Sequence, residues 1–525
     1  MPRAFDQELP EIWSDTMTAN LRGQLLIFVT WGLLAQAAEA AAPPACRVGF
    51  AERDISPEIG MERPGGYSKA RFSAFHDPCK VRAVVFDDGQ QRVALVGIDA
   101  LGIRRDTVEH ARKAIHDQCG IEPEAILIGA SHSHSSGPTV WIKPGDFDGA
   151  TPLVQELAYE KCTTADPEYL ELVEKQLVAA VCEADRKRTP ARCGVGRGKE
   201  DQVAFNRRFR MRTGLTATHP RPGNPDILEP AGKTDPEVGV IGVWDESKKL
   251  IGCVVNFACH ATLDPAPGAI SANYIYYLEK VIRGSMGNDV VVVFLNGASG
   301  DITQVDNRAT HANMSPERWS QFVGGRLGAE ALKVLLTMEP GDLVPVNHGV
   351  DMLSLKRRVP RADRVQKSLA LVQQKSPAVA PDEFIWAKEI VLLDAMLQKQ
   401  PQIEAEVQMI QVEPAVFVTT PAEYFCEFGL EIKAGSSFPF TFPVSLANGC
   451  VGYVPTEEAF GPRGGGYETR LTSYSNLEPT AGRKLADAGL ELIRRLKPGA
   501  VPQRAPATPY TNNPWAYGNV PPELD

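Results

Sequence analysis

The sequence predicts an α/β fold of the mixed α+β kind, with one large domain whose mixed β-sheets are covered by helices. Strand-like and helix-like segments alternate from about residue 81 to residue 300. Several strand-like runs are apolar throughout, as in strands that are buried on both faces. The composition agrees, because 43% of the residues are hydrophobic and 23% are charged, as in ordinary globular proteins.

The first 42 residues have the pattern of a secretory signal peptide. Arg22 precedes the apolar run 25–34, and Ala38-Glu39-Ala40 matches a small-residue cleavage site. The run is too short to span a bilayer comfortably. Met17 fits as the start of the chain, because the polar residues before it do not belong in such a signal. A membrane anchor or a buried helix remains the alternative to a secreted or periplasmic protein.

Charge and cysteine spacing exclude two classes of function. The net charge is -10 and no basic stripe is present, so a nucleic-acid partner is not expected. The chain has 10 cysteines but no CxxC pair, so a cysteine zinc site is not indicated. After export these thiols would meet an oxidising compartment. Cys253 and Cys259 lie in a strand-like run and are expected to be buried, whereas the pairing of the others is left open.

Apolar periodicity predicts the elements of the first half in chain order. Strands are expected at 81–86, 92–98, 125–129, 251–259 and 289–295. Helices are expected at 104–119, with Asp106 near the cap, at 167–188 and at 274–286. Residues 211–236 are rich in Thr, Pro and Gly and are expected to form a long loop, of the kind that is often functional.

The second half continues the mixed pattern without a second independent domain. Helices are expected at 316–336, 384–400 and 481–496, and strands at 348–355 and 415–419. Pro498-Gly499 ends the last helix. The expected division is therefore a signal region at 1–42, one domain at 46–498 and a proline-rich tail at 499–525.

The most informative segment is 131–138, Ser-His-Ser-His-Ser-Ser-Gly-Pro. It follows the apolar run 125–130, so His132 and His134 are expected at the end of a buried strand. Residues i and i+2 of a strand share a face, which would point both imidazoles the same way. Imidazole is a zinc ligand and also a general base near neutral pH. Two surface histidines are the simpler alternative.

Polar residues follow three further predicted strands. His260 follows the run 254–259, Asp301 follows the strand that ends near Asn296, and Glu423 follows the strand at 415–419. Strand carboxyl ends converge on one crevice in an α/β sheet, so these residues are expected to meet. Two histidines and a glutamate form a catalytic zinc set with an open position for water. Each residue alone also fits a structural role, as a core histidine, a turn cap or a solvated carboxylate.

Six motifs in the same chain order resemble the catalytic N-terminal region of the neutral/alkaline (non-lysosomal) ceramidases, over about residues 48–475. The motifs are Gly-Phe-Ala-Glu-Arg-Asp-Ile-Ser-Pro at 49–57 with Gly-Gly-Tyr at 65–67, the segment 131–138, Phe-Ala-Cys-His-Ala-Thr at 257–262, Gly-Asp-Ile-Thr at 300–303, Thr-Pro-Ala-Glu at 420–423, and Gly-Tyr-Val-Pro-Thr at 452–456 with Gly-Tyr-Glu at 466–468.

The resemblance implies a zinc-dependent amidase. The zinc ligands that it implies are His132, His260, Glu423 and Tyr453, with His134 free to transfer a proton. Strand geometry alone leaves open which histidine of the pair binds the metal. The other catalytic residues that it implies are Arg207 and Tyr467 at the oxyanion, Asp301 behind a metal ligand, and the hydroxyl of Thr303, whose role stays open. Asp99 is a second candidate for the supporting position of Asp301, or else part of a helix-entry turn.

Three departures from the family pattern stand out. Thr303 and Gln304 occupy the positions of a serine and a proline, and Ala422 occupies that of a glycine. Too few residues follow Tyr467 for the C-terminal β-sandwich domain of full-length ceramidases, so a domain without it is expected. Access to membrane lipid would then differ from that of the family.

Three functions are compatible with these observations. The first is an exported zinc hydrolase that cleaves the amide of a ceramide-like N-acyl lipid into a fatty acid and a sphingoid base, with possible peripheral membrane contact. The second is a zinc amidase or esterase of the same fold that acts on a soluble, non-lipid small molecule. The third is a non-catalytic binding protein. Intact candidate residues such as His132, His260 and Glu423 favour an enzyme.

Overall fold

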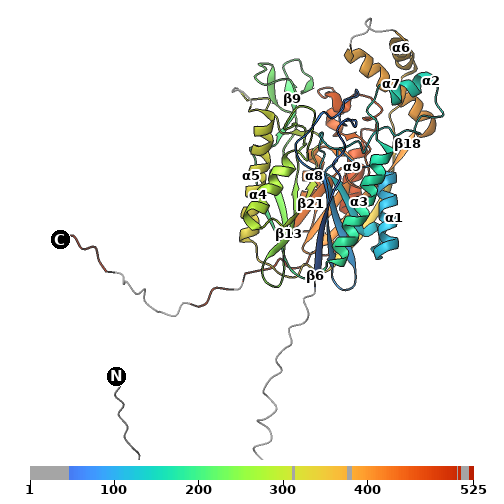
Figure 1. Cartoon of the computed structure of the whole chain (residues 1–525). Helices are drawn as coiled ribbons and strands as arrows, with labels where there is room; N and C mark the ends of the chain where they lie inside the picture. Colours follow the sequence, from blue (N-terminus) through green and yellow to red (C-terminus); the bar gives the residue numbers. More distant parts are fainter. Residues whose placement is uncertain (1–45, 310–313, 375–380, 505, 510–519) are drawn as a thin grey trace, which may run out of the picture. The chain divides into compact units, whose positions relative to one another are not determined.

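The computed structural model describes residues 46–309, 314–374, 381–504, 506–509 and 520–525 (Figure 1). The predicted signal region at 1–42 lies outside these residues. Within the described part of the chain, no helix combines the length and the apolar character needed to cross a membrane.

The first large sheet contains the strand that leads to His132. Its strand order is β5-β4-β3-β1-β6, with β4 and β5 parallel and the other neighbours antiparallel. The strands are β1 (Arg47–Asp54), β3 (Lys80–Asp87), β4 (Arg92–Ile98), β5 (Ile126–Ala130) and β6 (Thr189–Pro190). Helices α1 (Arg105–Cys119) and α3 (Pro167–Arg186) pack on one another, and α3 covers β1 and β3. Every residue of β5 is buried, which explains its continuous apolar sequence.

The second large sheet supplies His260 and Asp301. Its strand order is β15-β13-β12-β7, and β13 and β15 are parallel. The strands are β7 (Arg192–Lys199), β12 (Glu237–Trp244), β13 (Leu250–Phe257) and β15 (Val291–Asn296). Helices α4 (Tyr274–Met286) and α5 (Pro316–Thr337) pack together and cover this sheet.

The third large sheet supplies Glu423. Its strand order is β17-β18-β19-β21. The strands are β17 (Val346–Lys356), β18 (Gln402–Val412), β19 (Ala415–Thr420) and β21 (Phe440–Ser445). Helices α8 (Cys426–Gly435) and α9 (Ala481–Arg494) pack against each other and against this sheet. Strand β18 was not among the predicted strands, because polar residues such as Gln408 and Gln411 interrupt its apolar residues although they are buried.

The remaining elements are short or peripheral. Two-residue strands pair as β2 (Ala74–Phe75) with β14 (Ala269–Ile270), β8 (Phe205–Asn206) with β16 (Ile302–Thr303), and β20 (Glu423–Tyr424) with β22 (Tyr453–Val454). The other helices are α2 (Pro152–Tyr159), α6 (Ala362–Val372) and α7 (Pro381–Lys399), with 3-10 turns at Pro123–Ala125, Glu457–Phe460 and Tyr467–Thr469.

The predicted long loop at 211–236 is partly wrong. A small antiparallel sheet of β9 (Arg208–Met211), β10 (Thr216–Thr218) and β11 (Ile227–Pro230) occupies much of this segment. The strands have three or four residues each, so turn residues dominate the local composition and conceal them. Asp106 lies in the first turn of α1, whereas Arg104 occupies the cap position.

The three large sheets share one core between the helix pairs. Figure 1 shows α4 and α5 on one side of the strands and α1 and α3 on the other. One buried apolar cluster draws side chains from all three sheets, among them Val96, Leu295 and Phe442. A Cβ at Gly97 would lie 2.4 Å from the Phe294 carbonyl oxygen, so glycine permits the close approach of the first two sheets. The mixed α/β class predicted from sequence is therefore confirmed.

Candidate metal centre and active site

The two histidines of the segment 131–138 come together through a turn and not through a strand. Strand β5 ends at Ala130, and His132 has a left-handed φ of 63°. The expectation that strand alternation aligns the two rings is therefore wrong. Ser133 instead forms a parallel bridge with Ala261, which brings both histidines beside His260. The ring centroids of His132 and His260 are 4.3 Å apart, and those of His132 and His134 are 4.9 Å apart.

Backbone carbonyls fix the orientation of His132 and His260. The Nδ1 of His132 lies 2.7 Å from the oxygen of Leu101, and the Nδ1 of His260 lies 2.7 Å from the oxygen of Ser299. A carbonyl oxygen only accepts a hydrogen bond, so each Nδ1 carries the proton. The Nε2 atoms of both rings then face into the site. Carbonyl support of this kind is typical of metal-binding histidines.

Glu423 brings a third acceptor to the same point. Its Oε2 lies 3.2 Å from His132 Nε2 and 3.1 Å from His260 Nε2. The His132 nitrogen makes no hydrogen bond at this distance, although it is buried. Burial and the nearby Arg207 lower the pKa of His260 to about 3, which keeps this ring neutral. Two imidazole nitrogens and a carboxylate oxygen thus meet at one point, and this donor set fits a cation such as zinc.

Contacts from the histidines also control the charge of Glu423. Burial raises the pKa of its carboxyl group, whereas positive charge on the facing His132 and His260 would lower it well below the usual value. The side chain is only 4% exposed, so water does little to stabilise a negative charge on it. An isolated carboxylate is costly to bury, so the site is most stable with a cation beside it.

His134 completes a group of three histidines that can hold a metal. One ring nitrogen from each of His132, His134 and His260 lies within 4.8 Å of the others. The Nε2 of His134 is buried and has no hydrogen-bond partner. Gly65 has a left-handed φ of 95°, and a Cβ at this position would lie 2.3 Å from His134 Nδ1. The glycine of the predicted opening motif therefore allows the chain to pack against this imidazole.

Arg207 is held beside the same site by three contacts. Its Nη2 donates to the Gly300 oxygen at 2.7 Å, and its Nε donates to Glu468 Oε1 at 3.0 Å. The third nitrogen, Nη1, lies 3.0 Å from His260 Nε2, so the guanidinium already faces the inward lone pair of that ring. Only 2% of Arg207 is exposed. A fixed cation at this place can stabilise negative charge on a bound substrate.

Two tyrosine rings pack against the guanidinium of Arg207. The short parallel pair of β20 and β22 places Tyr453 opposite Glu423. The hydroxyls of Tyr453 and Tyr467 are 3.1 Å apart, and both rings lie within 5.5 Å of the Arg207 Cζ. Burial raises the pKa of Tyr453, and Glu423 adds to the effect, so the free side chain is a neutral phenol. Its deprotonation to a metal ligand would need the charge of the metal itself.

Asp301 and Thr303 lie behind the site. Asp301 accepts from the Cys426 backbone N–H at 2.8 Å and from the Asn206 side chain at 2.7 Å. Burial raises the pKa of this aspartate. Asp301 thus connects the start of α8, which follows Glu423, to β8, which precedes Arg207. Thr303 is 1% exposed and lies in β16, where its hydroxyl accepts from the Val305 N–H at 3.4 Å.

Asp99 does not support the histidines. Its Oδ2 accepts from Arg82 Nη1 at 2.8 Å and from the Lys80 N–H at 2.8 Å. The proposed supporting role for Asp99 is therefore wrong, because a buried arginine on the neighbouring strand takes up its charge.

Sequence reasoning missed two residues that touch the site. Tyr474 donates its hydroxyl to Glu423 Oε1 at 2.8 Å, and nothing in its local sequence indicates this. Glu468, which is fully buried, holds Arg207 and accepts from the Thr218 hydroxyl. A signal for Glu468 was present, since it follows Tyr467 within the Gly-Tyr-Glu motif.

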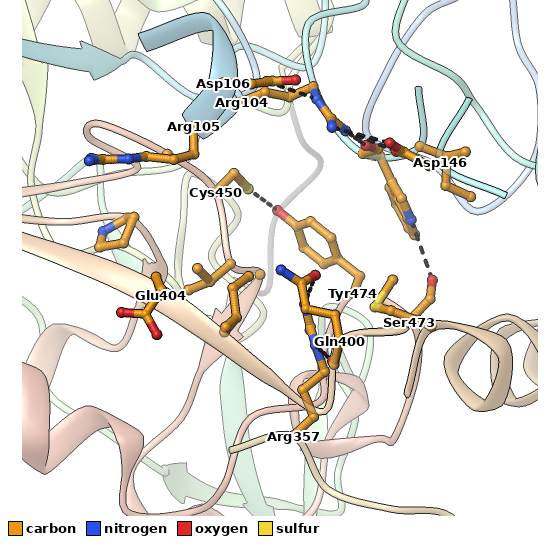
Figure 2. Close-up of a pocket in the computed structure, with 18 of the residues that line it drawn as sticks. Arg104, Arg105, Asp106, Asp146, Arg357, Gln400, Glu404, Cys450, Ser473 and Tyr474 are labelled. Atoms are coloured by element: carbon orange, nitrogen blue, oxygen red, sulfur yellow. Dashed lines mark hydrogen bonds and ion pairs between the residues drawn. The ribbon is translucent and has the colours of Figure 1, made fainter. Parts of the chain in front are cut away.

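Tyr474 also lines a pocket of about 500 Å³, whose lining includes none of the three histidines. Figure 2 shows its ring between Cys450, Ser473 and Gln400, and its hydroxyl lies 3.4 Å from Cys450 Sγ. Trp141 stacks on the ring with centroids 4.7 Å apart. The rest of the lining is mixed in character, with charged side chains such as Arg357 and Glu404.

Two solved structures share this fold. A neutral ceramidase from Pseudomonas aeruginosa matches with a TM-score of 0.63 and 17% identity, over 89% of this chain and 77% of that one. A ceramidase complexed with C2 matches with a TM-score of 0.64 and 17% identity, over 87% of this chain and 77% of that one. No family model matches the sequence, and no curated protein matches it significantly. The chain therefore has a neutral ceramidase-like fold, as the sequence motifs predicted.

Proposed function

We propose that this chain is a zinc-dependent hydrolase that cleaves the amide bond of a ceramide-like N-acyl substrate. The products are a fatty acid and a sphingoid base. The observation that carries the proposal is the meeting of His132 Nε2 and His260 Nε2 within 3.2 Å of Glu423 Oε2, with the Nδ1 atom of each histidine held by a backbone carbonyl. The fold that surrounds these atoms is shared with two ceramidases, and this likeness supports the choice of an N-acyl substrate.

A zinc ion would supply a Lewis acid for the amide carbonyl and would make water acidic enough to attack near neutral pH. The residues that would hold it are His132, His260 and Glu423, with Tyr453 as a fourth ligand. His132 is favoured over His134 because its Nδ1 is fixed by a backbone carbonyl and its Nε2 faces Glu423.

His134 is placed to move protons in this reaction. Burial and the neighbouring imidazoles of His132 and His260 lower its pKa well below the usual value, so the ring is neutral at pH 7. A neutral imidazole accepts a proton from the attacking water and then returns it to the leaving amine. Its free, buried Nε2 is the atom that would carry the proton.

Arg207 and Tyr467 would stabilise the negative oxygen that develops when the carbonyl is attacked. Burial raises the pKa of Tyr467, so its hydroxyl stays protonated and can donate. Arg207 is held by Glu468 and by the Gly300 carbonyl before substrate binds, so little reorganisation is needed.

A soluble amide or ester is the second candidate substrate. The pocket beyond Tyr474 has charged side chains, among them Arg104, Asp146 and Arg357, in place of a purely apolar lining. A lipid chain would gain little from such a lining, whereas a polar molecule would find partners there. Export of the protein and peripheral contact with a membrane belong to the first candidate and are proposed with it.

The test is hydrolysis of a short fluorescent N-acylsphingosine by the zinc-loaded protein, beside a soluble N-acyl amino acid. Release of the acyl chain from the lipid by the wild type, and its loss in His260→Ala, would support the first candidate. Turnover of only the soluble amide would support the second. A protein that binds zinc but turns over neither substrate would favour the binding-protein alternative.

A further inference from the structure

The sulfur atoms of Cys119 and Cys182 lie 3.1 Å apart although the two residues are separated by 63 positions. Cys119 is the last residue of α1, and Cys182 lies toward the end of α3. A disulfide bond is about 2.05 Å long, so a movement of roughly 1 Å would join the two sulfurs. The two helices already pack against each other, and the bond would not require them to separate.

The end of α1 is held in place around Cys119. Arg92 donates to the Cys119 oxygen at 2.9 Å and to the Gly120 oxygen at 2.8 Å. The Cys119 thiol points back to the Ile115 oxygen at 3.1 Å. These contacts keep the two sulfur atoms close together, so the chain loses little conformational freedom when the bond forms.

The two thiols differ in exposure. Cys119 is partly exposed, whereas Cys182 is only 6% exposed. Burial and the neighbouring Cys182 raise the pKa of Cys119 to about 12. Little of the reactive thiolate is therefore present at neutral pH, and oxidation of Cys119 is expected to be slow. Cys46 and Cys193 are also in contact, but both are fully buried and are shielded from an oxidant in the folded protein.

We propose that Cys119 and Cys182 form a disulfide bond that links the end of α1 to α3. The oxidant is another disulfide, either a small molecule or an oxidoreductase. The Cys119 thiolate attacks this disulfide and releases one thiol, and the Cys182 thiolate then attacks Cys119 Sγ and releases the second. One S–S bond breaks and one forms, and the two protons of the cysteines pass to the two released thiols.

The bond would enclose the segment that contains His132 and His134. The closed loop runs from α1 through β5, the two histidines and α2 to α3. Cross-linking such a long loop restricts the unfolded chain and so raises the stability of the folded state. The proposal goes beyond the proposed function and does not depend on it.

Peptide mapping tests the bond directly. The wild-type protein, purified without reductant, is incubated with oxidised glutathione, denatured, alkylated and digested with trypsin. The expected product is peptide 114–161 linked to peptide 176–186, and reduction should separate the two. Recovery of Cys119 and Cys182 as separate alkylated thiols would overturn the proposal.

Thermal unfolding gives a second, independent measurement. Reduction of the oxidised wild type should lower its Tm by roughly 2–5 °C, and the shift should vanish in Cys119→Ser and in Cys182→Ser. Cys253→Ser is the matched control, since it removes a buried cysteine and should keep both the linked peptide and the shift. A shift of the same size in Cys119→Ser would assign the effect to other cysteines and would contradict the proposal.

Discussion

At the scale of single residues, the site is defined by the direction in which its donor atoms face. The Leu101 and Ser299 carbonyls accept from the Nδ1 atoms of His132 and His260, so both Nε2 atoms face inward. Glu423 adds a carboxylate oxygen beside them, and Arg207 Nη1 lies 3.0 Å from His260 Nε2. Two imidazole nitrogens and a carboxylate oxygen suit a metal ion such as zinc. The sequence predicts which residues form the site. It does not predict the orientation of the two imidazole rings, because the carbonyls that fix them belong to residues far away in the chain.

Tyr474 should strengthen metal binding through Glu423. Its hydroxyl donates to Glu423 Oε1, which orients the other oxygen toward the histidines. Tyr474→Phe is therefore expected to weaken zinc binding by roughly 10–100-fold, as measured by competition with a chromogenic chelator. Tyr276→Phe, in α4, is the control and should bind zinc as the wild type does. Equal affinity in both variants would show that the hydrogen bond does not support the site.

Glu468 should matter to catalysis through Arg207. Glu468→Gln removes the charge that holds the guanidinium, so kcat is expected to fall by roughly 10-fold or more with little change in KM. Glu458→Gln is a matched control, because Glu458 pairs with Arg210 at the surface and is 63% exposed in its side chain. A kcat for Glu468→Gln equal to that of the control would exclude this role.

At the scale of elements, the predicted meeting of strand ends occurs, but the contacts that produce it were not predicted. The apolar strands β5, β13 and β19 do deliver His132, His260 and Glu423 to one place. They belong to three different sheets, however, and one crevice in a single sheet was expected. The contacts that join these strand ends are bridges such as Ser133 with Ala261, whose partners are far apart in sequence. No local pattern could reveal them.

The helix α4 is tied to the first sheet by an ion-pair network that depends on pH. Glu279 accepts from Lys80 and Arg82, and these cations together with Arg283 outweigh the effect of burial and lower its pKa from 4.5 to about 2. A lowered pKa in the folded state means that the stabilisation is complete above pH 4.5. It is lost as the pH falls toward 2.

Glu279→Gln should therefore lower the free energy of unfolding by about 3 kcal/mol at pH 7. The difference from the wild type should shrink as the pH is lowered from 4.5, as followed by chemical denaturation at each pH. Asp117→Asn, which breaks an exposed pair with Lys113, is expected to change stability by less than about 1 kcal/mol. A difference that stays constant from pH 7 to pH 3 would contradict a lowered pKa of Glu279 in the folded protein.

At the scale of the whole molecule, the fold is shared with ceramidases at only 17% identity. Six short motifs were sufficient to predict it, because they contain the site residues and the glycines that permit close approach. Gly300 is an example, since a Cβ there would lie 2.4 Å from the backbone carbonyl oxygen of Glu423. Side chains between the motifs vary more freely, because a core accepts many apolar residues of similar volume.

Zinc should stabilise the whole domain, because the three residues proposed to bind it follow strands of all three large sheets. With a site that binds only in the folded state, zinc at 100 times its Kd is expected to add about 2.7 kcal/mol. The Tm should therefore rise with zinc and fall on chelation. His132→Ala is expected to lose this dependence, whereas His116→Ala, on the outer helix α1, should keep it. A Tm that does not respond to zinc in the wild type would oppose a metal site at this position.

The most direct test of zinc binding by His132, His260 and Glu423 is a crystal structure of the zinc-loaded protein, with anomalous data collected on both sides of the zinc edge. We expect one zinc peak about 2.0–2.2 Å from His132 Nε2, from His260 Nε2 and from a Glu423 oxygen. A zinc peak elsewhere in the domain, or three histidines without a peak in zinc-saturated crystals, would contradict it.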